Sequence, residues 1–291
     1  MRQQAAGLFP DPQGRTQSGF LFFARNDIVG VSKKGNDSMK NVFSGLVTAF
    51  SMYSALPMPQ LAWDRHTMKY AMGFFPLVGV LTGAVFWLWL WVCGAFSLDG
   101  TLCAAVVTVL PIVLSGGIHL DGLIDTGDAL GSHQSAERRL EILKDSHVGA
   151  FGVILCAAYL LLLFGFAAQL AARPQNALIV CCGYVLSRGF SSFSVVSLRL
   201  ARDTGLAHAF ADGADKKTVR IVSVIWIILS MACMLLMYPL AGAAASALSF
   251  IWFLVFRRLC YSKFGGLTGD LAGFLLCFTE LIVLACAAVL P

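Results

Sequence analysis

The sequence predicts an all-α, polytopic integral membrane protein with about seven transmembrane helices, preceded by an interfacial or re-entrant N-terminal segment. Composition is the first reason: 58% of the 291 residues are hydrophobic, 13% are charged and the mean hydropathy is +0.76. The second reason is that apolar stretches long enough to cross a bilayer recur along the chain. The third is the uneven distribution of Lys and Arg among the loops between them.

The N-terminal region divides into a polar part and a short apolar part. Residues 1–38 are polar and lack the apolar core of a secretory signal, so we expect a disordered extension there and a single membrane-embedded domain over 39–291. The apolar stretch 42–56 is short, is interrupted by serines and ends before Pro57 and Pro59. It therefore predicts an interfacial or re-entrant segment rather than a full span.

Seven longer apolar stretches follow this segment. They lie at about 70–96, 101–118, 148–170, 176–198, 219–238, 240–256 and 270–290. The polar block 119–147 is the clearest interruption between them, and we interpret it as a loop of the same domain. The nine cysteines lie mostly within or beside these stretches and include no CxxC pair, which favours small apolar residues over metal ligands or disulfides.

The distribution of basic residues predicts the orientation. The loops of one side carry thirteen Lys and Arg: Arg65, Lys69, Arg138, Arg139, Lys144, Arg199, Arg202, Lys216, Lys217, Arg220, Arg257, Arg258 and Lys263. The loops of the other side carry only Arg173. Because positive residues collect in cytoplasmic loops, the chain is expected in the cytoplasmic membrane with its polar motifs facing the cytoplasm. This bias also explains the net charge of +5, which therefore gives no indication of nucleic-acid binding.

Three aspartates in the run GGIHLDGLIDTGDALG are the first candidate site. On a helix, Asp121, Asp125 and Asp128 would share an arc of about 60° and an axial span of roughly 10 Å. Like charges at this spacing repel, so we expect a cation among them. Carboxylate oxygens suit Mg²⁺ better than zinc, and Mg²⁺ commonly brings a diphosphate to a nucleophile. The alternative, aspartates that only cap helices, suits one of them better than all three.

The run ERRLEILKDSHVGAFG is the second candidate. It predicts an amphipathic helix on the membrane surface whose apolar residues, Leu140, Ile142 and Leu143, point inward. Its charged residues are interpreted as a solvated face: Glu137, Arg138, Arg139 and Glu141. Asp145 or Ser146 is expected to cap the next helix. For Lys144 and Asp145, function and a structural role stay open: the lysine suits a phosphate, and the carboxylate suits a metal or a proton.

The run FGGLTGDLAG at 264–273 is the third candidate. Gly265, Gly266 and Gly269 predict a flexible turn, and Thr268 or Asp270 is placed to cap the last span. A helix N-terminus preceded by glycines is also an anion site. Since this loop and the aspartates are expected on the same side of the membrane, a shared site is the favoured interpretation.

Two charges lie inside predicted spans, where an unpaired charge is costly. We expect Arg188 to reach a phosphate or the aspartates, and Glu280 to pair with another helix. His119 and His147 are of interest by position, and His119 is a candidate substrate contact. Their spacing is not that of metal ligands, which disfavours zinc.

These three motifs, in this order relative to the spans, closely resemble the cobalamin synthase family, the adenosylcobinamide-GDP ribazoletransferases. The resemblance covers about 42–290 and includes SMYSALPMPQ and FFPLVGVLTG. It implies a Mg²⁺-dependent membrane enzyme that joins adenosylcobinamide-GDP to α-ribazole or its 5′-phosphate and releases GMP. One departure is Ala55, which stands where similar sequences often have a basic residue.

The resemblance and the residues together give a set of expected roles. The catalytic residues are Asp121, Asp125, Asp128 and Asp145. The metal ligands are Asp121, Asp125, Asp128 and Asp270. The substrate contacts are His119, Lys144, Arg188, Gly265, Gly266, Thr268 and Gly269. The expected partners are the two substrates and the lipid bilayer, with a homo-oligomer left open.

Three other classes of protein compete with this interpretation. CDP-alcohol phosphotransferases would have an Ala-Arg pair after the Asp-Gly, but Gly122 is followed by LIDTGD. Membrane prenyltransferases would have two similar Asp-rich motifs, but GLTGDLAG has one carboxylate. A carboxylate-coupled transporter would have its aspartates at midspan and in paired repeats, whereas here they cluster at a helix end.

Overall fold

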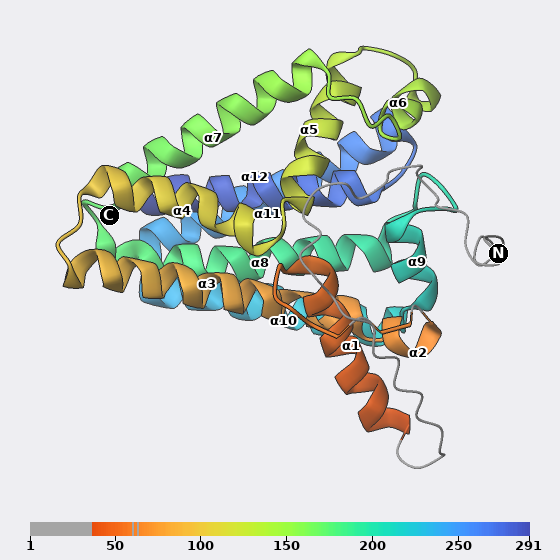
Figure 1. Ribbon diagram of the computed structural model, residues 1–291, viewed down its shortest axis with the longest axis horizontal. Coiled ribbons are helices and arrows are strands. Elements are labelled where there is room, and N and C mark those ends of the chain that lie inside the picture. Colours follow the sequence, from red (N-terminus) through yellow and green to blue (C-terminus); the bar gives the residue numbers. More distant parts are fainter. Residues whose placement is uncertain (1–36, 60, 63) are drawn as a thin grey trace, which may run out of the picture.

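The computed structural model describes residues 37–59, 61–62 and 64–291, and within them every element is helical apart from one isolated β-bridge (Figure 1). The helices are α1 (Asp37–Tyr53), α2 (Arg65–Met68), α3 (Ala71–Ala95), α4 (Gly100–Leu114), α5 (Ile118–Gly131), α6 (Ala136–Ile142), α7 (Ala150–Leu170), η1 (Pro174–Asn176), α8 (Ala177–Ser197), α9 (Leu206–Gly213), α10 (Lys216–Met237), α11 (Pro239–Phe264) and α12 (Gly269–Val289).

The predicted class, an all-α polytopic membrane protein, is confirmed. Six helices of the described residues are long and apolar enough to cross a membrane: α3, α7, α8 together with η1, α10, α11 and α12. A seventh span results if α4 and α5 are counted as one broken span. The predicted span 101–118 is shorter in the structure, because α4 ends at Leu114 and α5 leaves it at an angle of 92°. Gly116 and Gly117 form this corner with positive φ angles of 63° and 81°, which glycine adopts without steric cost.

The N-terminal helix α1 covers most of the predicted segment 42–56 but begins and ends earlier. It starts at Asp37, runs for 17 residues and is not among the long apolar helices of the described chain. Its Phe43 side chain is exposed, while Val47 and Ala49 pack inward. The extension predicted at 1–38 lies outside the described residues except for Asp37 and Ser38, which begin the helix.

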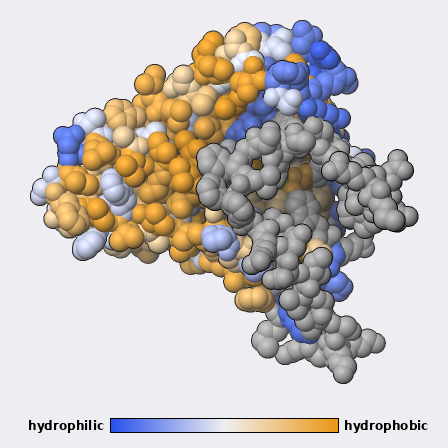
Figure 2. All heavy atoms as spheres, in the orientation of Figure 1, coloured by the Kyte–Doolittle hydropathy of each residue, from blue (hydrophilic) through white to orange (hydrophobic). Residues whose placement is uncertain are grey.

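The centre of the bundle is formed by α8 and α12, which run side by side and are mostly buried (Figure 1). Small residues let the helices approach closely, as expected in a membrane, where packing drives helix association. At Gly79 of α3, for example, an added Cβ would collide with the Tyr184 carbonyl of α8. The outer helices α7 and α10 are mostly exposed, and Figure 2 shows a continuous hydrophobic surface beside a hydrophilic end of the molecule.

A disulfide between Cys93 and Cys103 corrects the prediction that the cysteines are only small apolar residues. The two residues lie at the end of α3 and the start of α4, and the tight turn between the helices brings their Cα atoms to 6.2 Å. The remaining cysteines of the described residues are free thiols. This turn lies at the end of the bundle opposite α6 and α9 (Figure 1).

Candidate active site

The crossing of α5 over the first turns of α12 brings two of the sequence motifs together. An added Cβ at Gly122 would lie 2.7 Å from the Asp270 carbonyl oxygen and 3.0 Å from its Cα atom. On the other side of the contact, a Cβ at Gly273 would lie 3.1 Å from the His119 carbonyl oxygen. The backbones therefore touch at these glycines. As predicted from the shared side of the membrane, the aspartate motif and the α12 loop form one region.

The three aspartates of α5 have different surroundings, although they share one helix. Asp121 lies in the first turn and is exposed. Asp125, one turn further along, is only 8% exposed. Asp121 and Asp125 lie one residue before and three residues after Gly122, on the part of α5 that crosses α12.

Asp128 is engaged in capping α7. Its Oδ2 accepts the Gly149 N–H at 2.7 Å, and its Oδ1 accepts the Gly152 N–H at 2.8 Å. The glycines are required here, because a Cβ at Gly152 would lie 2.5 Å from Oδ2. The prediction that Asp145 or Ser146 caps this helix is wrong, since the cap comes from α5. Both Asp128 oxygens thus satisfy backbone donors that a helix N-terminus leaves unpaired.

The loop before α12, predicted as a flexible turn, makes close backbone contacts with the loop after α8. Gly265 ends α11 with a φ of 72°, and Gly266 packs so closely on the loop after α8 that an added Cβ would lie 2.6 Å from the Ala201 nitrogen. A parallel bridge joins Leu200 to Leu267. Thr268 caps α12 by accepting the Leu271 N–H, as predicted. Gly269 has open space around it within the described chain, so a ligand can approach this helix N-terminus.

Two arginines of this region were not identified as site residues from the sequence. An Arg202 guanidinium nitrogen lies 3.8 Å from Asp270 Oδ2, and both side chains are largely buried. Arg199 donates to the Gly265 carbonyl at 2.8 and 3.2 Å. The sequence does carry a signal for them, the run RLARD directly after a predicted span. Its two arginines were counted only to predict the orientation of the chain in the membrane. The pairing with the α12 loop depends on the tertiary fold.

The connection between α6 and α7 carries two exposed candidates, Lys144 and Asp145. Asp145 Oδ1 accepts the His147 backbone N–H at 3.0 Å and lies 2.7 Å from His147 Nδ1. The hydrogen bonds from the His147 backbone and ring lower the pKa of Asp145 below its ordinary value. Asp145 is therefore ionised at neutral pH.

Helix α6 matches its predicted amphipathic pattern with one exception. Leu143 is buried, and Arg138 forms an exposed ion pair with Glu141 at 2.5 Å. Arg139, predicted on the solvated face, is only 8% exposed and donates to the Lys263 carbonyl at 3.3 Å. This contact joins α6 to the end of α11, so the arginine has a structural role that periodicity alone did not indicate.

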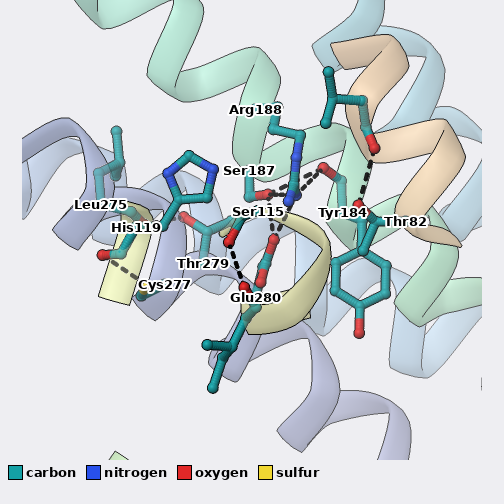
Figure 3. Close-up of polar contacts among 12 residues, drawn as sticks. Thr82, Ser115, His119, Tyr184, Ser187, Arg188, Leu275, Cys277, Thr279 and Glu280 are labelled. Atoms are coloured by element: carbon teal, nitrogen blue, oxygen red, sulfur yellow. Dashed lines mark hydrogen bonds and ion pairs between the residues drawn. The ribbon is translucent and has the colours of Figure 1, made fainter. Parts of the chain in front are cut away.

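Arg188 and His119 are buried inside the bundle, and Figure 3 shows them near Glu280 and Ser187. Arg188 is 1% exposed, and its Nη1 is 2.5 Å from Glu280 Oε1 and 2.9 Å from the Tyr184 carbonyl. The predicted helix pairing of Glu280 is therefore confirmed. Arg188 lies nine residues before the end of α8, about 14 Å along the helix. Its predicted contact with a phosphate stays a prediction, and in this structure its partner is Glu280.

The carboxylates near the α5–α12 crossing fit a Mg²⁺ site that the substrate completes better than a site made of protein ligands alone. Within the described residues, no group of three or more His, Cys, Asp or Glu side chains is close enough to hold a metal ion. Mg²⁺ typically uses one or two carboxylates and completes its coordination with substrate phosphates and water. Asp121 and Asp125 on α5 and Asp270 across the Gly122 contact are the carboxylates from which one or two such ligands can come.

Comparison with known proteins gives one consistent result. Residues 45–288 match the family described as cobalamin-5-phosphate synthase. An adenosylcobinamide-GDP ribazoletransferase of Lachnoclostridium phytofermentans is 41% identical over 82% of this chain and 91% of its own. Proteins of the same name from Desulfitobacterium hafniense and Clostridium perfringens (strain ATCC 13124) are 34% and 32% identical, over 81% and 83% of this chain and 93% and 96% of their own. No solved structure matches the chain.

Proposed function

The chain belongs to the cobalamin-5-phosphate synthase family, and from this premise we propose how its residues perform the ribazoletransferase step of cobalamin biosynthesis. The substrates are adenosylcobinamide-GDP and α-ribazole or its 5′-phosphate. A ribazole hydroxyl oxygen bonds to the phosphorus next to cobinamide, and the bond from that phosphorus to the GMP oxygen breaks. The products are adenosylcobalamin or its phosphate, GMP and the proton of the hydroxyl.

The observation that carries the proposal is the Gly122–Asp270 contact, because it joins the two acidic motifs. Asp121, Asp125 and Asp270 are the carboxylates from which Mg²⁺, bound together with the substrate diphosphate, would take one or two ligands. When bound, Mg²⁺ neutralises the diphosphate and the charge that develops on the departing GMP. Asp128 supports this set by fixing α7 against α5 through its two backbone hydrogen bonds.

In this proposal the diphosphate binds at the N-terminus of α12 and to nearby basic side chains. Gly269 leaves the N-terminus of α12 accessible, and Thr268 fixes the start of that helix. Backbone N–H groups at such an end bind phosphate oxygens. Arg202, next to Asp270, and the exposed Lys144 add positive charge for the two phosphates. Gly265 and Gly266 hold this loop against Arg199 and Ala201 rather than contacting substrate.

Asp145 is the proton acceptor in this proposal. It is exposed, ionised and oriented by His147, so its carboxylate is available to a ribazole hydroxyl. Its lowered pKa makes it a weak base. A weak base suffices, because phosphoryl transfer has a loose transition state in which the nucleophile is little bonded and loses its proton late.

Replacing Asp145 by Asn is expected to lower kcat by about 10²-fold, the lower end of the range for general-base catalysis. The Mg²⁺ concentration for half-maximal rate and the thermal stability should stay unchanged, because Asp145 is exposed. Glu141→Gln removes an exposed carboxylate from the preceding helix, α6, and is the matched control. Equal kcat values for the two variants would exclude Asp145 as the proton acceptor.

The site is proposed to face the cytoplasm. The charge difference between the loops supports this orientation. The Cys93–Cys103 disulfide supports it independently, because disulfides persist in oxidising compartments and this one lies at the opposite end of the bundle.

A vesicle assay tests activity, metal dependence and orientation together. Inside-out membrane vesicles given adenosylcobinamide-GDP, α-ribazole and Mg²⁺ are expected to form cobalamin and GMP, and EDTA should stop the reaction. Right-side-out vesicles should be inactive until they are permeabilised, because adenosylcobinamide-GDP and Mg²⁺ are charged and do not cross the bilayer. Turnover by intact right-side-out vesicles would reverse the proposed orientation, and turnover in EDTA would exclude the metal.

A further inference from the structure

A small, partly open cavity of about 20 Å³ lies beside the buried ion pair. Its polar walls are Ser115, His119, Tyr159, Arg188, Cys277 and Glu280. Figure 3 shows that most of these side chains converge from α5, α8, α12 and the corner after α4. A cavity of at least about 10–15 Å³ holds a water molecule when it has two to four polar partners. This one has the required size and polarity.

Two buried nitrogens of the wall have no hydrogen-bond partner in the described part of the chain: His119 Nε2 and Arg188 Nε. His119 is 7% exposed and Arg188 is 1% exposed, so bulk water does not satisfy either group. A buried polar atom without a partner costs roughly 1–3 kcal/mol. Arg188 disfavours a cation in the cavity and Glu280 disfavours an anion, so the ligand must be neutral and able both to donate and to accept.

We propose that the cavity binds one water molecule, which joins His119 Nε2 to the Arg188–Glu280 pair and thereby fixes the beginning of α5. His119, Arg188 and Glu280 are then positioning residues for Asp121 and Asp125. This inference rests on the proposed metal role of those carboxylates. It replaces direct substrate contact as the role of His119 and Arg188.

The position of His119 lets it hold the beginning of α5. His119 follows the corner at Gly116 and Gly117, whose N–H groups donate to the Val113 and Ile112 carbonyls at 3.2 and 2.9 Å. These bonds close the corner within one segment of the chain, whereas the His119 side chain lines the same cavity as Arg188 of α8 and Glu280 of α12. On its other side, the His119 ring contacts Tyr53 and Phe75, with ring centroids 6.1 and 5.7 Å apart. These aromatic contacts hold the ring but do not involve its Nε2 atom.

The first test replaces His119 by Phe, which retains the aromatic contacts and removes the nitrogen. The half-saturating Mg²⁺ concentration should rise about tenfold, the lower end of the effect of outer-shell partners on metal sites, with thermal stability retained. His119→Gln, which keeps a polar group facing the cavity, should restore most of the Mg²⁺ affinity. The control is Ser192→Ala, which removes a buried hydroxyl group of α8 that does not line the cavity. It should leave the Mg²⁺ dependence unchanged.

The second test replaces the ion pair by apolar residues in the double variant Arg188→Met/Glu280→Leu. Such replacement of a buried pair is commonly tolerated, whereas removing one partner leaves a buried charge. The double variant should show the same increase in Mg²⁺ requirement as His119→Phe. Adding His119→Phe to it should cause no further increase, because both changes remove the same water bridge.

Asp121→Asn, measured in parallel, separates this inference from the proposed function. If Asp121→Asn is inactive and His119→Phe has the Mg²⁺ dependence of the unaltered protein, the water bridge is wrong and the metal site stands. If Asp121→Asn has full activity, the metal site itself is wrong. An experimental structure that resolves ordered waters should show one water within hydrogen-bonding distance of His119 Nε2, and a dry cavity would overturn the inference.

Discussion

Asp121→Asn and Asp125→Asn should each lower turnover by about 10²–10³-fold or more, the effect of removing one group that stabilises transition-state charge. Asparagine has nearly the same shape as aspartate but lacks the negative charge that attracts Mg²⁺. Asp121 is exposed, so its variant should accumulate in the membrane at the normal level. The measurement is the rate of GMP release from adenosylcobinamide-GDP by purified protein over a range of Mg²⁺ concentrations.

Asp128→Asn is the matched comparison, because it makes the same chemical change on the same helix. Its carboxylate already accepts the Gly149 and Gly152 N–H groups, and Asn retains only one of the two acceptor oxygens. We expect a loss of about 1 kcal/mol of stability, typical of a weakened cap, with a Mg²⁺ requirement near that of the unaltered protein. If Asp128→Asn raises the Mg²⁺ requirement as strongly as Asp121→Asn does, Asp128 is a ligand. Full activity of Asp121→Asn would remove Asp121 from the site.

Gly122→Ala should nearly abolish activity, although it adds only a methyl group and changes no charge. The new Cβ would lie 2.7 Å from the Asp270 carbonyl oxygen, so α5 and α12 must separate. Overpacking of this kind costs roughly 1–3 kcal/mol, and a displacement of about 1 Å can cost about 10²-fold in rate. The expected result is a lower melting temperature in detergent together with a large loss of kcat.

Gly165→Ala is the control for this substitution. Gly165 lies within α7, and no atom of the described chain is within 4 Å of its added Cβ. Alanine is the better helix former, so stability should stay equal or rise by up to about 1 kcal/mol, with activity unchanged. If Gly122→Ala has normal activity and stability, the close crossing of α5 and α12 does not exist in the working enzyme.

The sequence predicted the features that depend on local pattern. Hydropathy identified the long helices. The spacing of Asp121, Asp125 and Asp128 suits one helix, and the structure has them on α5, although the block 119–147 was interpreted as a loop. The three motifs also predicted the family. The Thr268 cap followed from a hydroxyl residue just before an apolar run.

The remaining features depend on contacts between distant segments. The three aspartates look equivalent in the sequence, and only the position of α7 makes Asp128 a cap. Arg202 is an ordinary loop charge until the Leu200–Leu267 bridge brings its loop to α12. Arg139 is likewise buried because of a distant segment, since its guanidinium donates to the Lys263 carbonyl at the end of α11. The bend at Gly116 and Gly117 was missed because a run of apolar residues indicates length but not direction.

Metal binding by the α5–α12 crossing is the central claim, and electron paramagnetic resonance of bound Mn²⁺ tests it most directly. Mn²⁺ accepts the oxygen ligands that Mg²⁺ uses and gives a signal that differs between the free and bound ion. In the presence of adenosylcobinamide-GDP, purified protein should bind Mn²⁺ saturably. Asp121→Asn should weaken this binding at least about tenfold, whereas Asp128→Asn should change it little. Equal Mn²⁺ affinity in the unaltered protein and in Asp121→Asn would contradict the account.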